Sequence, residues 1–253
     1  MISNMRILYF GNDWVGLEIL KFLKTKNENI IGLVLHPNSN SIYKKELIEL
    51  FPDVCKIEWD KSNIPFIEKQ ILKLNPDIIL SMWFGYLIPS SIFKLAPKGA
   101  INIHPGYLPY NRGKNPNVWA IVDETPAGVA LHYIDEGIDS GPIIARKRVE
   151  SDYTDTADTL YEKLRKVSVE ILKENWDSIK NNRIEIIKPK EKGTFHYGKH
   201  FASLDEIFLN KKYKAKDLIN ILRARTFPPN KGVYFQINGK RYYINIKIYE
   251  EKI

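Results

Sequence analysis

Short apolar segments alternate with segments of helical periodicity along most of the chain, and this alternation constrains the fold more than any other feature. Strands are predicted from apolar runs at 6–10, 30–36, 77–83, 100–104, 128–134 and 142–150. After the first of them, Leu17, Leu20 and Leu23 recur at the spacing of one helix face. Strands that alternate with helices are typical of a mostly parallel sheet with helices on both faces. The sequence therefore predicts a Rossmann-like α/β fold.

Helices are predicted between these strands, and proline and capping residues indicate where some of them begin. Helical periodicity is found at 15–24, 46–51, 66–74, 90–96, 115–123 and 155–179. Pro89 is expected at the first helical position of 90–96, where its missing N–H costs nothing. Thr154 or Asp155 is expected to cap the helix at 155–179, because their side-chain oxygens accept hydrogen bonds from the free N–H groups of a first turn.

The composition changes near residue 186, and the remaining chain is predicted to form a small appendage. A linker, a helix and a hairpin are expected at 188–200, 215–226 and 233–248. Asn238-Gly239 is the turn signal that closes the hairpin. We therefore predict a large N-terminal domain at 1–187 and a small C-terminal subdomain at 188–253. The second hairpin strand would leave an exposed edge, so we expect a homodimer through this hairpin.

Composition and charge exclude several classes of protein. The chain has one cysteine, Cys55, so no disulfide framework is expected, and no apolar run approaches the length of a membrane span. The start of the chain lacks the pattern of a secretory signal. The formal net charge is +8, but no module that combines aromatic and basic residues for nucleic-acid binding is visible. We expect a cytoplasmic protein without a nucleic-acid or membrane partner.

Two polar clusters follow predicted strands and form the candidate site. Asn102 and His104 end one strand and, being two residues apart, point to the same face. The second cluster, at 135–139, follows the strand at 128–134 and is rich in carboxylates. Ligands of open α/β sheets bind beyond the carboxyl ends of the strands, so the two clusters can meet there.

An asparagine, a histidine and a carboxylate together suit acyl transfer. The asparagine amide can donate to a developing oxyanion, the histidine can accept a proton, and the carboxylate can orient the histidine. No serine or cysteine lies in a nucleophile elbow, so the substrate itself would supply the nucleophile, an amine. A purely structural histidine at the strand end is the alternative. A metal site is a further reading, but no ligand spacing typical of metals supports one at His104, His132, Asp135 and Asp139.

Two stretches of the sequence carry a resemblance to a known family. "GAINIHPGYLPYNRGKNPNVWAI" and "GVALHYIDEGIDSGPII" resemble the formyltransferases that use 10-formyltetrahydrofolate. The hallmarks N-x-H, Leu-Pro, R-G, P-x-x-W-A and H-x-x-D-x-G-x-D-x-G occur here in order. The match is strong over 75–150 and extends in outline over 1–190. It implies the formyltransferase fold, with 1–187 as the catalytic domain.

The resemblance implies roles for individual residues. Asn102 would hold the formyl oxygen, His104 would take the proton of the attacking amine and pass it towards N10 of the folate, and Asp139 would orient His104. The co-substrate would be 10-formyltetrahydrofolate, with no metal. Its binding residues would be Tyr86, Leu87, Ile88, Lys114, Asp135, Glu136, Gly137 and Ile138. A cis bond at Leu108-Pro109 is also implied.

Further segments of the sequence indicate which class of amine accepts the formyl group. "KGTFHY" and "LRARTFPPNKGVYFQINGKRYYI" look most like the sugar N-formyltransferases, which act on dTDP-linked amino-dideoxyhexoses for bacterial surface polysaccharides such as lipopolysaccharide O-antigen. A methionyl-tRNA formyltransferase is the alternative, although it carries a C-terminal barrel larger than the stretch that follows residue 200. A third reading is a non-catalytic module that binds folate or a nucleotide sugar. The sequence does not choose between a 3-amino and a 4-amino sugar.

A dTDP-linked sugar would need cations for its diphosphate and an aromatic surface for thymine. Candidate substrate-binding residues are Asn12, Asp13, Trp14, Arg112, Phe195, His196 and Tyr197. Each has a structural alternative: the aromatic residues suit core packing, and Asp13 suits a helix cap.

Overall fold

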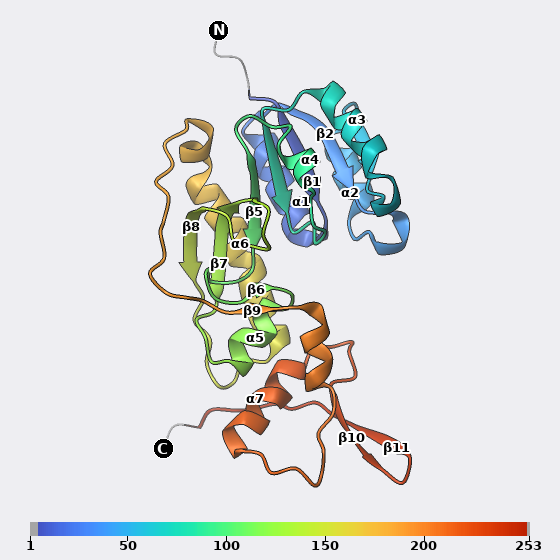
Figure 1. The fold of residues 1–253 in the computed structure, drawn as a ribbon, viewed down its shortest axis with the longest axis vertical. Coiled ribbons are helices and arrows are strands. Elements are labelled where there is room, and N and C mark those ends of the chain that lie inside the picture. The colour runs from blue at the N-terminus through green and yellow to red at the C-terminus, as the bar shows by residue number, and fades with distance from the viewer. Residues whose placement is uncertain (1–4, 252–253) are drawn as a thin grey trace. The chain divides into compact units, whose positions relative to one another are not determined.

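Seven strands form the main sheet of the computed structural model, which describes residues 5–251 (Figure 1). Their order across the sheet is β3-β2-β1-β4-β5-β7-β8. They span Ile7–Gly11 (β1), Ile30–Leu35 (β2), Cys55–Glu58 (β3), Ile78–Met82 (β4), Ala100–His104 (β5), Gly128–Tyr133 (β7) and Ile143–Arg148 (β8). Strands β1 to β5 run parallel, and β7 runs antiparallel to β5. The predicted α/β fold with a mostly parallel sheet is confirmed.

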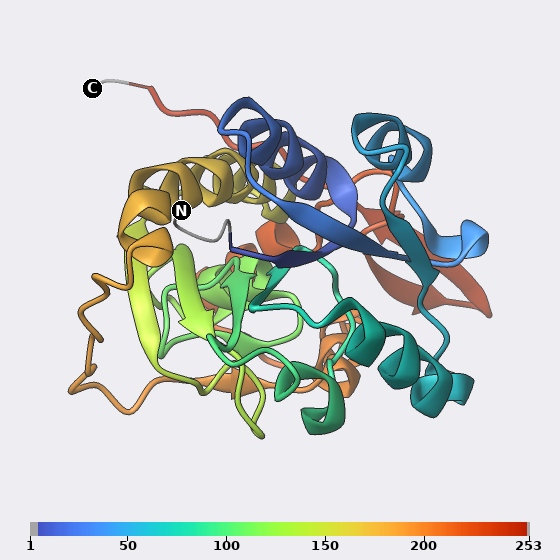
Figure 2. The ribbon, with the colours of Figure 1, turned by 90° about the horizontal axis from the view of Figure 1, so that it is seen from above.

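The described chain contains the helices α1 (Asp13–Thr25), α2 (Lys44–Leu50), α3 (Ile64–Leu74), α4 (Ser90–Phe93), α5 (Pro116–Val122), α6 (Ala157–Lys180) and α7 (Ala215–Arg225), with short 3-10 turns at Asn38–Asn40 (η1), Lys61–Asn63 (η2) and Gly198–Leu204 (η3). Those that belong with the main sheet cover both of its faces (Figure 2). Figure 2 shows α1 and the last part of α6 on one face, and α3 and α4 on the other. This is the doubly covered arrangement expected of a parallel sheet.

The alternation of side chains along β1 shows how the core is divided between the two faces. Leu8 and Phe10 pack in a buried cluster with Ile67 of α3. Tyr9 points to the opposite face, and its hydroxyl donates to the carbonyl oxygen of Gly16 in α1 at 2.5 Å. Full burial raises the pKa of Tyr9 well above its usual value, because the phenolate would be poorly solvated. Both faces of β1 are therefore buried.

The chain forms two compact units. The sheet unit contains the residues up to His104 together with 130–145 and 168–188. The second unit contains 105–129, 146–167 and the residues from 189 onward. Asn102, His104 and Asp139 all belong to the sheet unit. The division into domains at 187/188 remains a prediction.

The structure differs from the sequence prediction at two places. The prediction missed β3, because this strand lies at the sheet edge and only Ile57 of its four residues is buried, which leaves no apolar run. Pro89 does not occupy the first helical position. It lies at the N-cap of α4 with extended backbone (φ −68°, ψ 157°), and α4 ends after one turn at Phe93.

The start of α6 also differs from the expectation, which placed the cap at Thr154 or Asp155. The helix begins later, and Thr156 and Thr159 cap it reciprocally. The N–H of Thr156 donates to Thr159 Oγ1 at 3.0 Å, and the N–H of Thr159 donates to Thr156 Oγ1 at 3.5 Å. The Asp155 carboxylate instead accepts hydrogen bonds from the Thr159 hydroxyl and from Lys163. Its use in these contacts explains why it does not cap the backbone.

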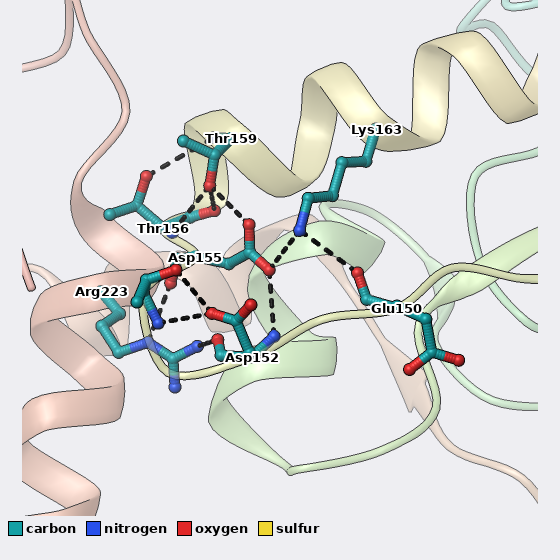
Figure 3. Close-up of polar contacts among 8 residues, drawn as sticks. Glu150, Asp152, Asp155, Thr156, Thr159, Lys163 and Arg223 are labelled. Carbon is teal, nitrogen blue, oxygen red and sulfur yellow. Dashed lines mark hydrogen bonds and ion pairs between the residues drawn. The ribbon is translucent and has the colours of Figure 1, made fainter. Parts of the chain in front are cut away.

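A buried arginine joins α7 to the loop before α6, as Figure 3 shows. Arg223 is 5% exposed. Its guanidinium donates to the carbonyl oxygen of Asp155 at 2.8 Å, to the carbonyl oxygen of Asp152, and to Asn220 Oδ1 at 3.0 Å. The carbonyl oxygen of Asp152 also accepts the N–H of Asp155 at 3.2 Å, but the carbonyl oxygen of Asp155 and Asn220 Oδ1 have no other donor among the described hydrogen bonds. Arg223 is therefore expected to be important for stability.

We expect Arg223→Met to destabilise the second unit. The methionine keeps the apolar stem but leaves two buried acceptors, the carbonyl oxygen of Asp155 and Asn220 Oδ1, without this donor. Since an unsatisfied buried acceptor costs roughly 1–3 kcal/mol, the free energy of unfolding should fall by about 3 kcal/mol. Urea unfolding monitored by circular dichroism measures this change. Arg183→Met, at an exposed position, serves as the control and should change the free energy by less than about 0.5 kcal/mol.

The predicted C-terminal hairpin is confirmed. Strands β10 (Val233–Ile237) and β11 (Lys240–Ile244) are antiparallel, and Asn238 and Gly239 both have positive φ, at 48° and 74°. Two positive φ values in a two-residue turn match the twist of the hairpin strands. The second strand ends at Ile244, earlier than the expected end at residue 248. Two short strands, β6 (Arg112–Gly113) and β9 (Phe195–His196), pair in parallel elsewhere in the second unit.

Candidate functional site

Asn102 and His132 face each other across neighbouring strands of the sheet unit. Asn102 lies in β5 and pairs in register with His132 of β7. Directly paired residues of antiparallel strands place their side chains on the same face of the sheet. Asn102 Nδ2 lies 3.1 Å from His132 Nε2, and His132 Nδ1 lies 2.8 Å from the carbonyl oxygen of Tyr133. Both nitrogens of the 2% exposed histidine therefore have hydrogen-bond partners.

His104 and Asp139 complete the cluster. His104 is the last residue of β5 and is 4% exposed. Its Nδ1 lies 3.4 Å from Asp139 Oδ2, while Asp139 Oδ1 lies 3.5 Å from His132 Nε2. One carboxylate thus lies between two imidazoles, on a backbone with φ of +48°, which aspartate tolerates better than most residues. The structure brings together the three residues predicted to form the catalytic group.

The loop that carries Asp139 folds back tightly onto β7. At Gly141 a Cβ atom would lie 1.9 Å from the carbonyl oxygen of Tyr133, so only glycine fits there. Asp135 Oδ1 accepts hydrogen bonds from the N–H of Gly137 at 3.0 Å and from the hydroxyl of Ser140 at 2.8 Å. This loop therefore has a defined shape, which holds Asp139 next to the histidines.

The arrangement suits acid and base chemistry at a carbonyl. An amide donor, an imidazole and a carboxylate lie within a small, largely buried volume. A nearby carboxylate favours the protonated form of an imidazole and so makes it a better proton acceptor. An amide N–H can stabilise negative charge that develops on a carbonyl oxygen.

The segment predicted to bind folate, Tyr86 to Ile88, follows β4, the parallel neighbour of β5. Leu87 is 70% exposed, whereas the side chain of Ile88 packs in the core, so only its backbone remains for a ligand. The ring of Tyr86 lies 4.4 Å from that of His36, and Lys61 Nζ lies 4.4 Å from its centre. Tyr86 is thus held between neighbours while Leu87 is left at the surface.

The other folate candidates of the sheet unit lie in the loop before Asp139. Glu136 forms an ion pair with Lys94 at 2.5 Å between exposed side chains, which links this loop to the end of α4. The Asp135 carboxylate is used within the loop itself, as described above. Gly137 and Ile138 lie between Glu136 and Asp139. The carboxylates of Asp135 and Glu136 therefore already have partners within the protein.

Three candidates for substrate binding follow β1. Asn12 is 9% exposed, and its Oδ1 accepts a hydrogen bond from the N–H of Ile42 at 3.0 Å. Asp13 starts α1, and its Oδ1 accepts from the N–H of Val15 at 3.2 Å. Trp14 follows in the first turn and is partly buried. The first two side chains thus have structural partners within the fold.

The remaining candidates lie in the second unit, around the β6–β9 pair. Arg112 lies over the ring of Phe195 at 5.6 Å, and Tyr197 is 52% exposed. The ring of His196 stacks on Trp119 with centroids 3.7 Å apart, and its Nε2 lies 2.7 Å from Asp123 Oδ2.

Lys114 follows β6, and its N–H donates to the carbonyl oxygen of His196. This group therefore combines a cation and aromatic rings, the residue types expected for a nucleotide.

The predicted cis bond at Leu108-Pro109 is confirmed.

The sequence did not identify three residues that these contacts involve. His132 was considered only as a metal ligand, although the H-x-x-D hallmark contains it, and its cross-strand contact with Asn102 depends on the register of β7. Trp119 and Asp123, the partners of His196, lie more than seventy positions earlier in the chain. Trp119 and Asp123 are four residues apart, so a helix that reaches this far places both on one face. This spacing was the only hint that the sequence offered.

The second unit also contains a cavity of about 380 Å³. Its charged lining includes Glu124, Asp152 and Arg223. Glu124 is paired with Lys216 at 2.7 Å, and hydrogen bonds from Thr154 lower the pKa of the Asp152 carboxyl by stabilising its charged form. None of the candidate site residues lines this cavity.

The described part of the chain shows neither a metal-binding cluster nor a membrane-spanning helix. Within residues 5–251, no group of three or more His, Cys, Asp and Glu side chains is arranged to hold a metal ion. Of the helices in this part of the chain, none combines the length and apolar character needed to cross a bilayer.

Residues 21–175 match the family described as formyl transferase, and residues 200–250 match the N-formyltransferase dimerization C-terminal domain. The chain is 30% identical to a methionyl-tRNA formyltransferase of Malacoplasma penetrans over 249 residues, which covers 94% of this chain and 76% of the relative. It is 29% identical to a dTDP-4-amino-4,6-dideoxyglucose formyltransferase of Mycobacterium tuberculosis over 177 residues, or 70% of this chain and 75% of the relative.

Solved structures agree with these similarities. A 4-N formyltransferase from Francisella tularensis superposes with a TM-score of 0.82 at 27% identity, covering 98% of this chain and 99% of that one. The formyltransferase PseJ from Anoxybacillus kamchatkensis, in complex with UDP-4,6-dideoxy-4-formamido-L-AltNAc and tetrahydrofolate, superposes with a TM-score of 0.58 at 25% identity, covering 87% and 98%.

Proposed function

The chain belongs to the formyl transferase family, and from this premise we propose that it transfers a formyl group from 10-formyltetrahydrofolate to the amino group of a dTDP-linked amino-dideoxy sugar. The observation that carries the proposal is the contact between His104 and Asp139 beside Asn102. This cluster offers a donor for the formyl oxygen and a base for the amine, and no nucleophilic side chain is needed. The sugar amine attacks the formyl carbon directly.

Each member of the cluster has a defined role in this scheme. Asn102 donates an N–H to the formyl oxygen, which becomes negative as the amine nitrogen bonds to the formyl carbon. His104 accepts the proton that the amine loses. When the bond from the formyl carbon to N10 breaks, its electron pair remains on N10, and His104 returns the proton there. Asp139, 3.4 Å from His104 Nδ1, stabilises the imidazolium that forms in between.

The residues present fit a folate as donor. Leu87 offers an exposed apolar surface in the segment that follows β4, the parallel neighbour of the strand that ends at His104. The loop from Asp135 to Asp139 has a fixed shape, and peptide groups are both donors and acceptors, which suits the hydrogen-bonding edge of a pterin ring. The tetrahydrofolate in the PseJ complex supports the same class of donor. When bound, the donor supplies the activated formyl group.

A nucleotide-linked sugar is proposed as the acceptor. The similarity to the mycobacterial dTDP-amino-sugar enzyme supports this substrate class. In the second unit, Arg112 and the exposed Tyr197 offer a cation and an aromatic ring, which are the groups that a diphosphate and a thymine need. Asn12, Asp13 and Trp14 remain candidates for contacts with the sugar.

Methionyl-tRNA is the second candidate acceptor, because a methionyl-tRNA formyltransferase matches 94% of the chain. One experiment separates the two. The protein is incubated with 10-formyltetrahydrofolate and either a panel of dTDP-linked 3-amino and 4-amino sugars or methionyl-tRNA, and each acceptor is analysed by mass spectrometry.

We expect one added formyl group on a dTDP-sugar only. Formylation of the tRNA alone would identify the other enzyme. Folate binding without transfer to any acceptor would indicate a non-catalytic module.

The proposal includes a cytoplasmic enzyme that forms a homodimer through the β10–β11 hairpin. The free, exposed thiol of Cys55 is typical of a reducing compartment. The hairpin exposes Tyr242 and Tyr243 at 45% and 43%, on opposite faces, and a two-stranded hairpin alone is only marginally stable. The match of residues 200–250 to a dimerization domain supports this assembly.

Replacing both hairpin tyrosines with glutamate should convert the dimer to a monomer. The two charges would have to be desolvated in the interface, which weakens association by several kcal/mol. Sedimentation velocity at micromolar concentration measures the effect. Lys240→Glu, at an exposed position of the same hairpin, changes charge without removing an aromatic contact and should leave the dimer intact. A dimer that persists in the tyrosine variant would contradict this interface.

A further inference from the structure

We propose that His132 is a positioning residue for Asn102, an inference that rests on the proposed formyl transfer. In this role His132 never touches the substrate. It is neutral, carries its hydrogen on Nδ1, and accepts a hydrogen bond from the Asn102 side chain. The contact directs the amide nitrogen of Asn102, and not its oxygen, to the place where the formyl oxygen becomes negative.

The hydrogen-bond partners of His132 assign its tautomer. The carbonyl oxygen of Tyr133 can only accept, and it lies 2.8 Å from Nδ1, so Nδ1 carries a hydrogen. A neutral imidazole has a single N–H, which leaves a lone pair on Nε2. Asn102 Nδ2 lies 3.1 Å from Nε2, and with this tautomer it is the donor. A charged imidazolium would instead donate from both nitrogens, and the amide nitrogen of Asn102 could not accept from Nε2 at 3.1 Å.

The orientation of the Asn102 amide matters because the two ends of an amide have opposite chemistry. The final side-chain torsion of asparagine is broad and roughly two-fold, so the nitrogen and the oxygen can exchange places at little cost. With the nitrogen held by His132, one of its hydrogens is used and the second remains for the formyl oxygen. If the side-chain oxygen of Asn102 took the place of its nitrogen, it would repel the formyl oxygen, on which negative charge develops. The transition state would then lose its hydrogen-bond donor.

The surroundings make this contact well defined. Asn102 and His132 are directly paired residues of β5 and β7, so the backbone hydrogen bonds of the sheet fix their separation. His132 is 2% exposed, which leaves little room for water to compete for Nε2. The charged and titratable neighbours are Asp139, 3.5 Å from Nε2, and His104, whose ring centre lies 6.5 Å away.

The tautomer can be measured without any substrate. Histidine labelled with nitrogen-15 is incorporated into the wild-type protein, and the His132 signals are assigned by their loss in His132→Gln. We expect a protonated Nδ1 and an unprotonated Nε2 at the pH of the activity assay. A hydrogen on Nε2, in either the neutral or the charged ring, would overturn the inference.

Two substitutions test the consequence for catalysis. His132→Leu keeps most of the volume and removes the acceptor, while His132→Gln keeps an oxygen that can accept where Nε2 was. We expect kcat to fall about 10- to 100-fold in His132→Leu with little change in KM, since a misplaced donor costs mainly transition-state stabilisation. His132→Gln should retain most of kcat. Equal losses in the two variants would count against the positioning role.

A double substitution separates positioning from a general structural effect. If His132 acts through Asn102, then His132→Leu should lower kcat hardly at all in an Asn102→Ala background. Losses that multiply would show that His132 acts independently of Asn102, and the inference would fail. A wild-type enzyme that formylates no acceptor would overturn the proposed function itself, whereas a proton on Nε2 in an active enzyme overturns only the inference about His132. Should His132→Leu not fold, the spectrum and the glutamine variant still decide.

Discussion

Replacing His104 with alanine is expected to lower kcat for formyl transfer about 10²- to 10⁴-fold, the usual contribution of a general base. No other described histidine lies as close to the Asp139 carboxylate except His132, whose ring nitrogens already have partners. The sugar amine would then lose its proton to water alone. Steady-state kinetics with the formylated sugar as product measures this loss.

Two controls give the His104→Ala result its meaning. Binding of the folate, followed by fluorescence titration, should be unchanged, because the proposed folate contacts lie on the segment after β4 and on the loop before Asp139. Added imidazole should restore part of the rate, since the substitution leaves a gap where the imidazole ring of His104 stood. A variant with near-normal kcat, or one that loses both binding and turnover, would contradict the role given to His104.

Asp139→Asn is the second substitution with a large expected effect, a loss in kcat of about 10²- to 10⁴-fold by analogy with the aspartate of hydrolase triads. The amide keeps the shape of the side chain but no longer stabilises the imidazolium of His104. It can also donate to His104 Nδ1 and thereby favour the wrong tautomer. The backbone should tolerate the change, because asparagine is among the residues that adopt a φ of +48° most readily.

Asp77→Asn is the matched control for this experiment. Asp77 is also a partly buried aspartate of the sheet unit, and its Oδ2 accepts the N–H of Arg6 at 2.7 Å just before β4 begins. Asp77 thus lies at one end of β4, and the candidate folate segment from Tyr86 to Ile88 follows the other end. We expect Asp77→Asn to keep its kcat and Asp139→Asn to keep its melting temperature. Normal turnover in Asp139→Asn would rule out the proposed orientation of His104.

Much of the fold could be predicted because its signals are local. The apolar runs of the central strands β1, β4 and β5 are buried on both faces, so they stand out as continuous hydrophobic segments. The hairpin turn at Asn238-Gly239 needs two positive φ values, which few other dipeptides accept. The edge strand β3 lacked such a signal, because three of its four residues are not buried.

In the candidate site, too, some features follow from local sequence patterns and others depend on tertiary structure. That Asn102 and His104 share a face follows from the two-residue period of a strand and needs no coordinates. That His132 contacts Asn102 depends on the antiparallel register of β7, which the hydrophobic pattern of one strand does not define. The stacking of His196 on Trp119 depends on a return of the chain after residue 189, a tertiary contact without a local pattern.

The pairing of β5 with β7 has a practical consequence for anyone who prepares this enzyme. A slip of β7 by a single residue would turn His132 to the other side of the sheet and carry the loop with Asp139 out of place, while helix content and sheet content would barely change. Such molecules would look folded by spectroscopy yet be catalytically silent. Counting active sites by a single-turnover burst would therefore report the fraction of correctly aligned molecules, which no measure of secondary structure provides.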